Sequence, residues 1–230
     1  MSIKNNIELI RQKIDAAAEA AGRNPKDIKL IAVSKTKPMS DVSEAYDAGM
    51  CDFGENRPQE LAEKFRNLPQ ARWHLIGQLQ RNKVKYIIDK TFLIHSVDSV
   101  RLAEEIERRA ADIDKVQDIL IQVNISGEES KSGIKPSDTE EICRQISKMK
   151  HIHICGLMTI SVNGIGYDGN FRIFSELKRL AESIEALKIP GVSMAELSMG
   201  MTHDYEAAVA AGATMVRVGS GIFGLRDYMV

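Results

Sequence analysis

Short apolar runs alternate with longer amphipathic segments along almost the whole chain, and this alternation restricts the fold more than any other feature of the sequence. A run such as Leu30-Ile-Ala-Val33 is typical of a strand that is buried on both faces. We predict strands of this kind at residues 29–33, 50–53, 72–76, 91–97, 118–124, 153–158, 195–198 and 214–218. Apolar residues at three- and four-residue steps predict helices between them, at residues 41–48, 58–65, 82–88, 99–111, 138–149, 171–186 and 203–210.

Alternating strands and helices favour parallel pairing, because parallel neighbours need a crossover long enough to hold a helix. With a leading helix packed on the outside within residues 1–24, eight strands predict an α/β fold of the (β/α)8 or TIM-barrel type, formed by residues 1–230 as a single domain. The alternative is an open doubly wound sheet, which usually carries a glycine-rich dinucleotide fingerprint after its first strand. Ser34-Lys35-Thr36-Lys37-Pro38 stands at that place here, so the closed barrel is favoured.

The composition excludes several classes of partner. The chain has 31 Lys+Arg and 32 Asp+Glu, and its formal net charge of -1 argues against a bulk electrostatic grip on nucleic acid. It has no apolar run of the roughly 18 residues that span a bilayer, and its start lacks a signal peptide's apolar core. We therefore expect a cytoplasmic protein that binds neither nucleic acid nor membrane. Cys51, Cys143 and Cys155 are odd in number and widely spaced, which predicts buried free thiols.

A lysine, Lys35, follows the first predicted strand, at the end of the strand where a barrel places its functional groups. An ammonium that continues an apolar run is costly to desolvate, so Lys35 either reaches solvent or has its pKa lowered toward that of a neutral amine. A neutral amine is what a Schiff base with a carbonyl requires. Lys35 alone leaves both interpretations open.

Turns containing glycine and serine follow the last two predicted strands, namely Ser198-Met-Gly-Met201 and Gly219-Ser220-Gly221. In this fold the loops after strands seven and eight commonly hold a phosphate through backbone N–H groups. Plain turns have the same composition. Because two such turns follow neighbouring strands, the phosphate interpretation is favoured.

Arg217 stands between Val216 and Val218 in an otherwise apolar strand. If the valines face the helices, alternation turns Arg217 into the barrel, where a guanidinium needs an acceptor. That acceptor is either a carboxylate such as Glu196 or the pyridine nitrogen of pyridoxal phosphate, a cofactor atom for which such partners are known. His74, His95, His203 and Tyr205 are the other titratable groups near the predicted ends of the strands, and for His74 and His95 a hydrogen-bonded core role is favoured over catalysis.

A series of motifs runs in order along the chain: Ala32-Val-Ser-Lys35-Thr-Lys-Pro38, Phe53-Gly-Glu-Asn56, Trp73-His-Leu-Ile-Gly-Gln-Leu-Gln-Arg-Asn-Lys83, Gln122-Val-Asn-Ile-Ser126, Ser130-Lys-Ser-Gly133, Gly156-Leu-Met158, Leu197-Ser-Met-Gly-Met201 and Val216-Arg-Val-Gly-Ser-Gly-Ile-Phe-Gly224. Together they resemble the pyridoxal phosphate homeostasis proteins, a family similar to the amino-terminal barrel of bacterial alanine racemase. The resemblance extends from about Leu30 to Tyr228. After Asn56 many members carry an aromatic residue where this chain has Arg57, which leaves open any contact credited to the aromatic ring.

The resemblance implies that pyridoxal phosphate is held as an internal aldimine on a lysine, and it assigns roles to eight positions of this chain. Lys35 forms the imine, Asn56 lies near the cofactor ring, and Arg217 approaches the pyridine nitrogen. The phosphate is held by residues of the two turns: Ser198, Gly200, Met201, Gly219 and Ser220. The resemblance implies neither a metal ligand nor a dedicated catalytic residue.

Two functions are compatible with such a site. The first is a carrier, expected to be a monomer, that stores and buffers the cofactor and delivers it to apo-enzymes without robust catalysis of its own. Lys37 and Lys131 could hold or relay the cofactor in that role, or could simply be solvated.

The second function is an amino-acid racemase of the alanine racemase type. Such an enzyme needs an acid or base on each face of the α-carbon, and Lys35 serves one face only. Alanine racemases of this type also carry a β domain that supplies a tyrosine, whereas the sequence ends at Val230, directly after the last predicted barrel segment. We therefore predict the carrier.

Overall fold

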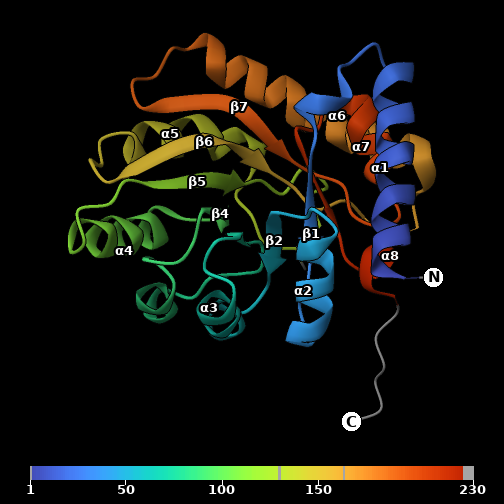
Figure 1. Cartoon of the computed structure of the whole chain (residues 1–230). Coiled ribbons are helices and arrows are strands. Elements are labelled where there is room, and N and C mark those ends of the chain that lie inside the picture. The colour runs from blue at the N-terminus through green and yellow to red at the C-terminus, as the bar shows by residue number, and fades with distance from the viewer. Residues whose placement is uncertain (1, 129–130, 163, 225–230) are drawn as a thin grey trace.

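Eight parallel strands form a closed barrel in chain order, and β8 pairs with β1 to complete it (Figure 1). The computed structural model describes residues 2–128, 131–162 and 164–224; the end of the predicted domain, with Tyr228, lies outside them. The strands are β1 (Lys29–Val33), β2 (Asp52–Glu55), β3 (Arg72–Leu75), β4 (Leu93–Val97), β5 (Gln117–Gln122), β6 (Ile152–Met158), β7 (Val192–Ser198) and β8 (Met215–Val218). The predicted (β/α)8 barrel is confirmed and the open sheet is wrong.

The strands are buried on both faces, as their continuous apolar runs predict. Alternate side chains point into the barrel, where five apolar residues form an inner core: Ile31, Leu93, Leu120, Met158 and Met215. The other side chains face the helices, and there Phe53 packs against Trp73 with ring centroids 5.3 Å apart. The buried polar residues Asp52, His74, His95, Ser198 and Arg217 are discussed below.

Helices surround the barrel and cover the outer faces of the strands (Figure 1). They are α1 (Ile3–Ala20), α2 (Met39–Asp47), α3 (Pro58–Asn67), α4 (Val100–Ala111), α5 (Thr139–Ile146), α6 (Gly166–Ala186), α7 (Tyr205–Ala211) and α8 (Ser220–Phe223), with 3-10 turns η1 (Pro25–Asp27), η2 (Arg81–Tyr86) and η3 (Pro136–Asp138). The leading helix α1 packs beside α7 and α8, as predicted, and buries Ile7, Ile10 and Ile14. Within the described residues, no helix is long and apolar enough to cross a membrane.

Two expectations from the sequence are corrected. The segment predicted as a helix at residues 82–88 is mostly the 3-10 turn η2, which buries Val84 and ends at Tyr86, before the buried Ile87. The prediction of buried thiols is wrong for two of the three cysteines, because Cys51 is exposed and Cys155 is half-buried, whereas Cys143 is buried.

Candidate functional site

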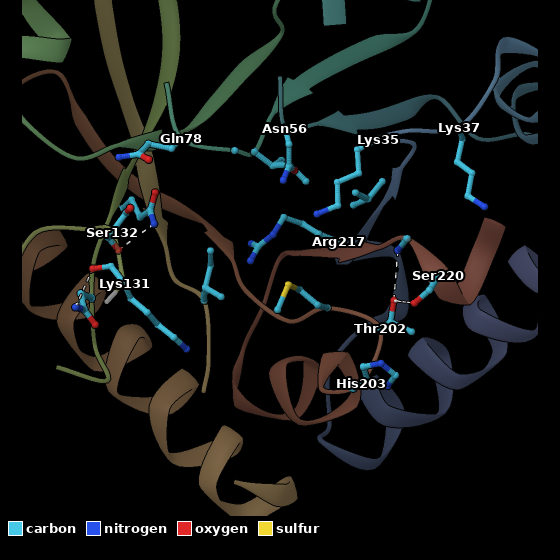
Figure 2. A pocket seen from close by; sticks show the side chains of 18 of the residues that line it. Lys35, Lys37, Asn56, Gln78, Lys131, Ser132, Thr202, His203, Arg217 and Ser220 are labelled. Carbon is cyan, nitrogen blue, oxygen red and sulfur yellow. Dashed lines mark hydrogen bonds between the residues drawn. The ribbon is translucent and has the colours of Figure 1, made fainter. Parts of the chain in front are cut away.

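A cavity of about 870 Å³ opens where the carboxyl ends of the strands meet, which is the end at which this fold builds its sites. Segments that follow β1, β2, β3, β5, β7 and β8 contribute to its lining (Figure 2). Six of the eight predicted site residues line it: Lys35, Asn56, Met201, Arg217, Gly219 and Ser220. Ser198 and Gly200 are buried and stand outside the lining that the described residues form.

The backbone on both sides of Lys35 is held in place by side chains of α3. The Nζ of Lys64 donates to the carbonyl oxygen of Ser34 at 2.6 Å, and the N–H of Thr36 donates to Oε1 of Glu60 at 2.6 Å. Lys64 also bridges to Glu60, with 2.8 Å between Nζ and Oε1. Thr36 has a φ of +64°, a left-handed conformation that a β-branched residue adopts only when its surroundings impose it. The backbone from which the Lys35 side chain extends is therefore held in one position.

The buried carboxyl group of Glu55, the last residue of β2, connects Lys64 of α3 and Ser34 to the sheet. Its Oε1 accepts hydrogen bonds from Nζ of Lys64 at 2.8 Å and from Oγ of Ser34 at 2.6 Å. Its Oε2 is buried with no hydrogen-bond partner among the described residues. Burial raises the pKa of Glu55 to about 7, although Lys64 and Ser34 oppose the rise. Glu55 therefore exchanges its proton near neutral pH.

Arg217 lies inside the barrel, as strand alternation predicts, and lines the cavity (Figure 2). One guanidinium nitrogen donates to Oγ of Ser198 at 2.6 Å and another donates to the carbonyl oxygen of Thr159 at 3.0 Å. Burial lowers the pKa of Arg217 to about 10, which still leaves it a cation at neutral pH. The alternative partner Glu196 instead lies 3.7 Å from Lys29 and accepts from the hydroxyl of Thr214.

A hydrogen-bonded chain connects Arg217 through the barrel interior to Asp52 at the amino end of β2. Oγ of Ser198 lies 2.8 Å from Nδ1 of His95, Nε2 of His95 lies 2.9 Å from Nδ1 of His74, and Nε2 of His74 lies 3.0 Å from Oδ1 of Asp52. Burial lowers the pKa of both imidazoles, most strongly that of His95, so both are neutral. Both histidines therefore belong to the hydrogen-bonded core, as predicted.

The charge of Asp52 decides which group donates and which accepts at each bond of this hydrogen-bonded chain. Burial acts to raise the pKa of Asp52, but hydrogen bonds from Arg72 and His74 lower it below its usual range. The carboxylate therefore accepts from Nε2–H of His74. Each neutral imidazole then accepts at its other nitrogen, and Ser198 donates to His95 while accepting from Arg217. In each of these hydrogen bonds the hydrogen points toward Asp52, away from the cavity. The orientation of Arg217 depends on the whole series of bonds.

The two turns after β7 and β8 meet at one side of the cavity, as the phosphate interpretation requires (Figure 2). Oγ1 of Thr202 accepts from the N–H of Gly219 at 3.4 Å and from Oγ of Ser220 at 3.3 Å, which joins the turns. Gly200 has a φ of +88°, and a Cβ there would lie 2.5 Å from the Cβ of Ala208, so only glycine fits. Hydroxyl and N–H groups suited to an anion thus gather opposite Arg217.

The remaining predicted residues are held at the rim. Asn56 follows β2, and its carbonyl oxygen would lie 2.4 Å from a Cβ on Gly77, so the glycine allows this close approach. Nζ of Lys37 donates to the carbonyl oxygen of Phe223 at 2.8 Å. Nζ of Lys131 donates to the carbonyl oxygen of Ser161. Both amines are therefore engaged by protein rather than simply solvated.

Sequence reasoning missed the group that holds Lys35 in place. The motif Phe53-Gly-Glu-Asn56 contains Glu55 but predicts no role for it, and Lys64 and Glu60 belong to no motif. The signal for Lys64 was available, because it falls in the helix predicted at residues 58–65 beside the apolar positions Leu61 and Ala62 and is only 5% exposed. Thr202, whose hydroxyl joins the two turns, was likewise missed.

Sequence comparison relates nearly the whole chain to one family. The family model described as "Alanine racemase, N-terminal domain" matches residues 2–227. The pyridoxal phosphate homeostasis protein of Aquifex aeolicus is 39% identical over 230 residues, which cover 99% of this chain and 100% of the relative. The chain belongs to the pyridoxal phosphate homeostasis protein family. The homeostasis protein family predicted from the motifs is therefore confirmed, and its curated relatives are named as homeostasis proteins rather than as racemases.

Solved structures agree with membership of the homeostasis protein family. PipY of Synechococcus elongatus, solved with pyridoxal phosphate bound, has a TM-score of 0.85 and 34% identity, covering 97% of this chain and 100% of that chain. An alanine racemase of Clostridium difficile has a TM-score of 0.77 and 14% identity, covering 99% of this chain and 58% of that chain. The racemase therefore shares the barrel fold with this homeostasis protein.

The hydrogen-bonded chain predicts that Ser198→Ala is more destabilising than Ser220→Ala. Removing the Ser198 hydroxyl leaves an N–H of Arg217 and Nδ1 of His95 unsatisfied inside the barrel, at about 1–3 kcal/mol for each group. The Ser220 hydroxyl is half-buried at the cavity and makes one long hydrogen bond, so its loss should cost less than about 1 kcal/mol. Urea unfolding of the two variants measures the difference, and equal losses of unfolding free energy would contradict the hydrogen-bonded chain.

The raised pKa of Glu55 predicts that the free energy of unfolding depends on pH. Between pH 4.5 and about 7 the folded protein keeps a proton on Glu55 that the unfolded chain has released, so this group makes the free energy of unfolding fall as pH rises. The fall is at most about 1.4 kcal/mol per pKa unit and is complete above pH 7. The difference in unfolding free energy between wild type and Glu55→Gln, measured in urea from pH 4.5 to 8, isolates it. A difference independent of pH would refute the assignment.

Proposed function

We propose that this homeostasis protein holds pyridoxal phosphate on Lys35, buffers its free concentration and passes it to apo-enzymes. The observation that carries the proposal is that Lys35, Arg217 and Ser220 line one cavity (Figure 2). An amine, a guanidinium and a hydroxyl with neighbouring N–H groups match the aldehyde, the pyridine nitrogen and the phosphate of that cofactor. The solved structure of PipY with the cofactor bound supports this match.

Each part of the site has a separate task in this proposal. Pyridoxal phosphate supplies an aldehyde that a lysine amine can hold covalently. Lys35 presents the amine from a fixed backbone, and the turns that Thr202 joins would hold the phosphate. Met201 and Asn56 line the cavity beside them. The hydroxyl of Ser198, which is bonded to Arg217, would act on the cofactor by orienting that arginine.

The titratable groups around the cavity favour a carrier over a racemase. A guanidinium has donors only, so Arg217 would leave the pyridine nitrogen unprotonated and the ring a weak electron sink. A racemase also needs a second acid or base. His74 and His95 are committed to the buried chain, and burial raises the pKa of Tyr205 to about 12. His203 lines the cavity but is exposed to water, which does not favour it as that base.

The carrier would act in the cytoplasm, as a monomer that meets apo-enzymes transiently. No robust catalysis is expected of it. The naming of the relatives as homeostasis proteins supports this role.

Lys35→Ala is expected to abolish the visible absorption of the cofactor-loaded protein, because the covalent link to the aldehyde is lost. Lys37→Ala is the matched control, since Lys37 lies two residues away at the same cavity and its amine donates to the carbonyl of Phe223. Borohydride reduction followed by peptide mass spectrometry should place the cofactor on Lys35 in wild type and in Lys37→Ala. Label on another lysine, or unchanged absorption in Lys35→Ala, would overturn the site assignment.

Delivery is tested by mixing the loaded protein with an apo-aminotransferase and an excess of an aldehyde scavenger. We expect the enzyme to gain activity faster than the scavenger collects cofactor, because handover shields the aldehyde. Free pyridoxal phosphate at the same concentration is the control, and the scavenger should suppress its effect. Activation no faster than release would show storage without handover, and racemisation of common amino acids at rates typical of a racemase would favour the alternative function.

A further inference from the structure

A second cluster of reactive side chains lies at the amino end of the barrel, the end opposite the cofactor cavity. Asp118 is the second residue of β5 and His153 is the second residue of β6, and the two are register partners. Cys155 follows two residues along β6 and packs against the inner core. Because the cavity is lined by the cavity-side ends and following loops of the strands, this cluster belongs to a different site.

His153 and Cys155 stand two residues apart on β6 and so share one face of the strand, and a β-bulge lies at Cys155. On β5 the register passes from a partner at Ile154 to a partner at Gly156, so Cys155 between them is the extra residue. Bulges bend a strand and re-aim side chains, and they occur often beside functional sites. Sγ of Cys155 lies 3.4 Å from Nδ1 of His153. Alternation along β6 therefore adds a sulfur atom to the pair that His153 forms with Asp118.

The separations within the cluster suit a shared metal ion. Nδ1 of His153 lies 3.0 Å from Oδ1 of Asp118, and the ligand atoms of Asp118, His153 and Cys155 all lie within 4.8 Å of one another. In a tetrahedral zinc site with bonds of about 2.0–2.3 Å, ligand atoms stand about 3.3–3.8 Å apart. Small side-chain rotations would bring all three to that spacing. The side chains of His153 and Asp118 are 43% and 44% exposed, which leaves an entry path and a fourth position for water.

The surrounding charges also favour a cation. The carboxylates of Asp118 and Glu196 lie close enough to the Cys155 thiol to act on it electrostatically. Lys29 lies 3.7 Å from Glu196 and offsets part of that negative charge. The remaining negative charge favours a divalent cation at the cluster.

We propose that Asp118, His153 and Cys155 form a binding site for zinc or a similar divalent transition-metal ion. Imidazole, thiolate and carboxylate are the ligand set that such ions prefer. Binding forms one bond each from Nδ1, Sγ and a carboxylate oxygen, with water in the fourth position. The thiol proton passes to solvent, and no electron is transferred. The ion links β5 to β6 at the amino end of the barrel and does not depend on the cofactor.

The test is a zinc titration of the cofactor-loaded, tag-free protein by calorimetry in buffers of different ionisation enthalpy, which counts the protons released. We expect one zinc ion per chain with release of the thiol proton. Cys155→Ala and His153→Ala should each weaken binding at least about tenfold, since even indirect supports of a metal commonly contribute that much. Cobalt(II) should give the strong red-region absorption of a tetrahedral site, away from the absorption of the cofactor.

Two matched variants separate this site from other surface groups. His151→Ala removes a histidine whose Nδ1 lies at the same distance, 3.0 Å, from a carboxylate oxygen, that of Glu107. His151 stands before β6 and its bulge. Cys51→Ala removes the exposed thiol. Both should bind zinc like wild type. Cofactor absorption in each variant confirms that the barrel is folded. Failure of the wild type to bind zinc saturably, full affinity in Cys155→Ala, or loss of binding in Cys51→Ala would overturn the proposal.

Discussion

The pairing of β8 with β1 is the constraint on which the rest of the structure depends. Across this seam Ile31 pairs with Arg217 and Ala32 pairs with Val218, so the last strand lies beside the first. Closure of a parallel barrel brings every carboxyl end to one ring. Lys35 and Arg217 are far apart in sequence and contribute to one cavity for this reason. In an open sheet with the same strands, β1 and β8 need not be neighbours, and the two residues would have no reason to meet.

Closure also encloses polar groups that water can no longer reach. A carboxylate, two imidazoles and a guanidinium would be very costly in the interior without hydrogen bonds. Here Arg217, Ser198 and the two imidazoles each donate a hydrogen bond to the next group, and the Asp52 carboxylate accepts the last one. The exposed Arg72 at the amino end balances the charge of Asp52 with two hydrogen bonds. The same groups therefore satisfy one another and fix the guanidinium that faces the cavity.

The sequence was sufficient to predict the barrel, Lys35 and Arg217, because strand ends and strand alternation decide their positions. Ser198 shows where such reasoning stops. The resemblance groups it with the residues that hold the phosphate, but it is the last residue of β7 and its hydroxyl is bonded to His95 and Arg217 inside the barrel. The contacts of Lys64 with Ser34 and Glu55 depend on how α3 packs against the sheet, which no local pattern encodes. The bulge at Cys155 likewise arises from pairing on both sides of β6.

The fixed backbone around Lys35 bears on how reversibly a ligand can be taken up. With Ser34 and Thr36 already anchored by α3, capturing an aldehyde confines only the torsions of one side chain. Little of the barrel has to reorganise, so little conformational energy is stored when the bond forms or regained when it breaks. In the proposed function, nearly all of the free energy of the bond to Lys35 would therefore contribute to affinity, because little of it is lost to ordering the protein.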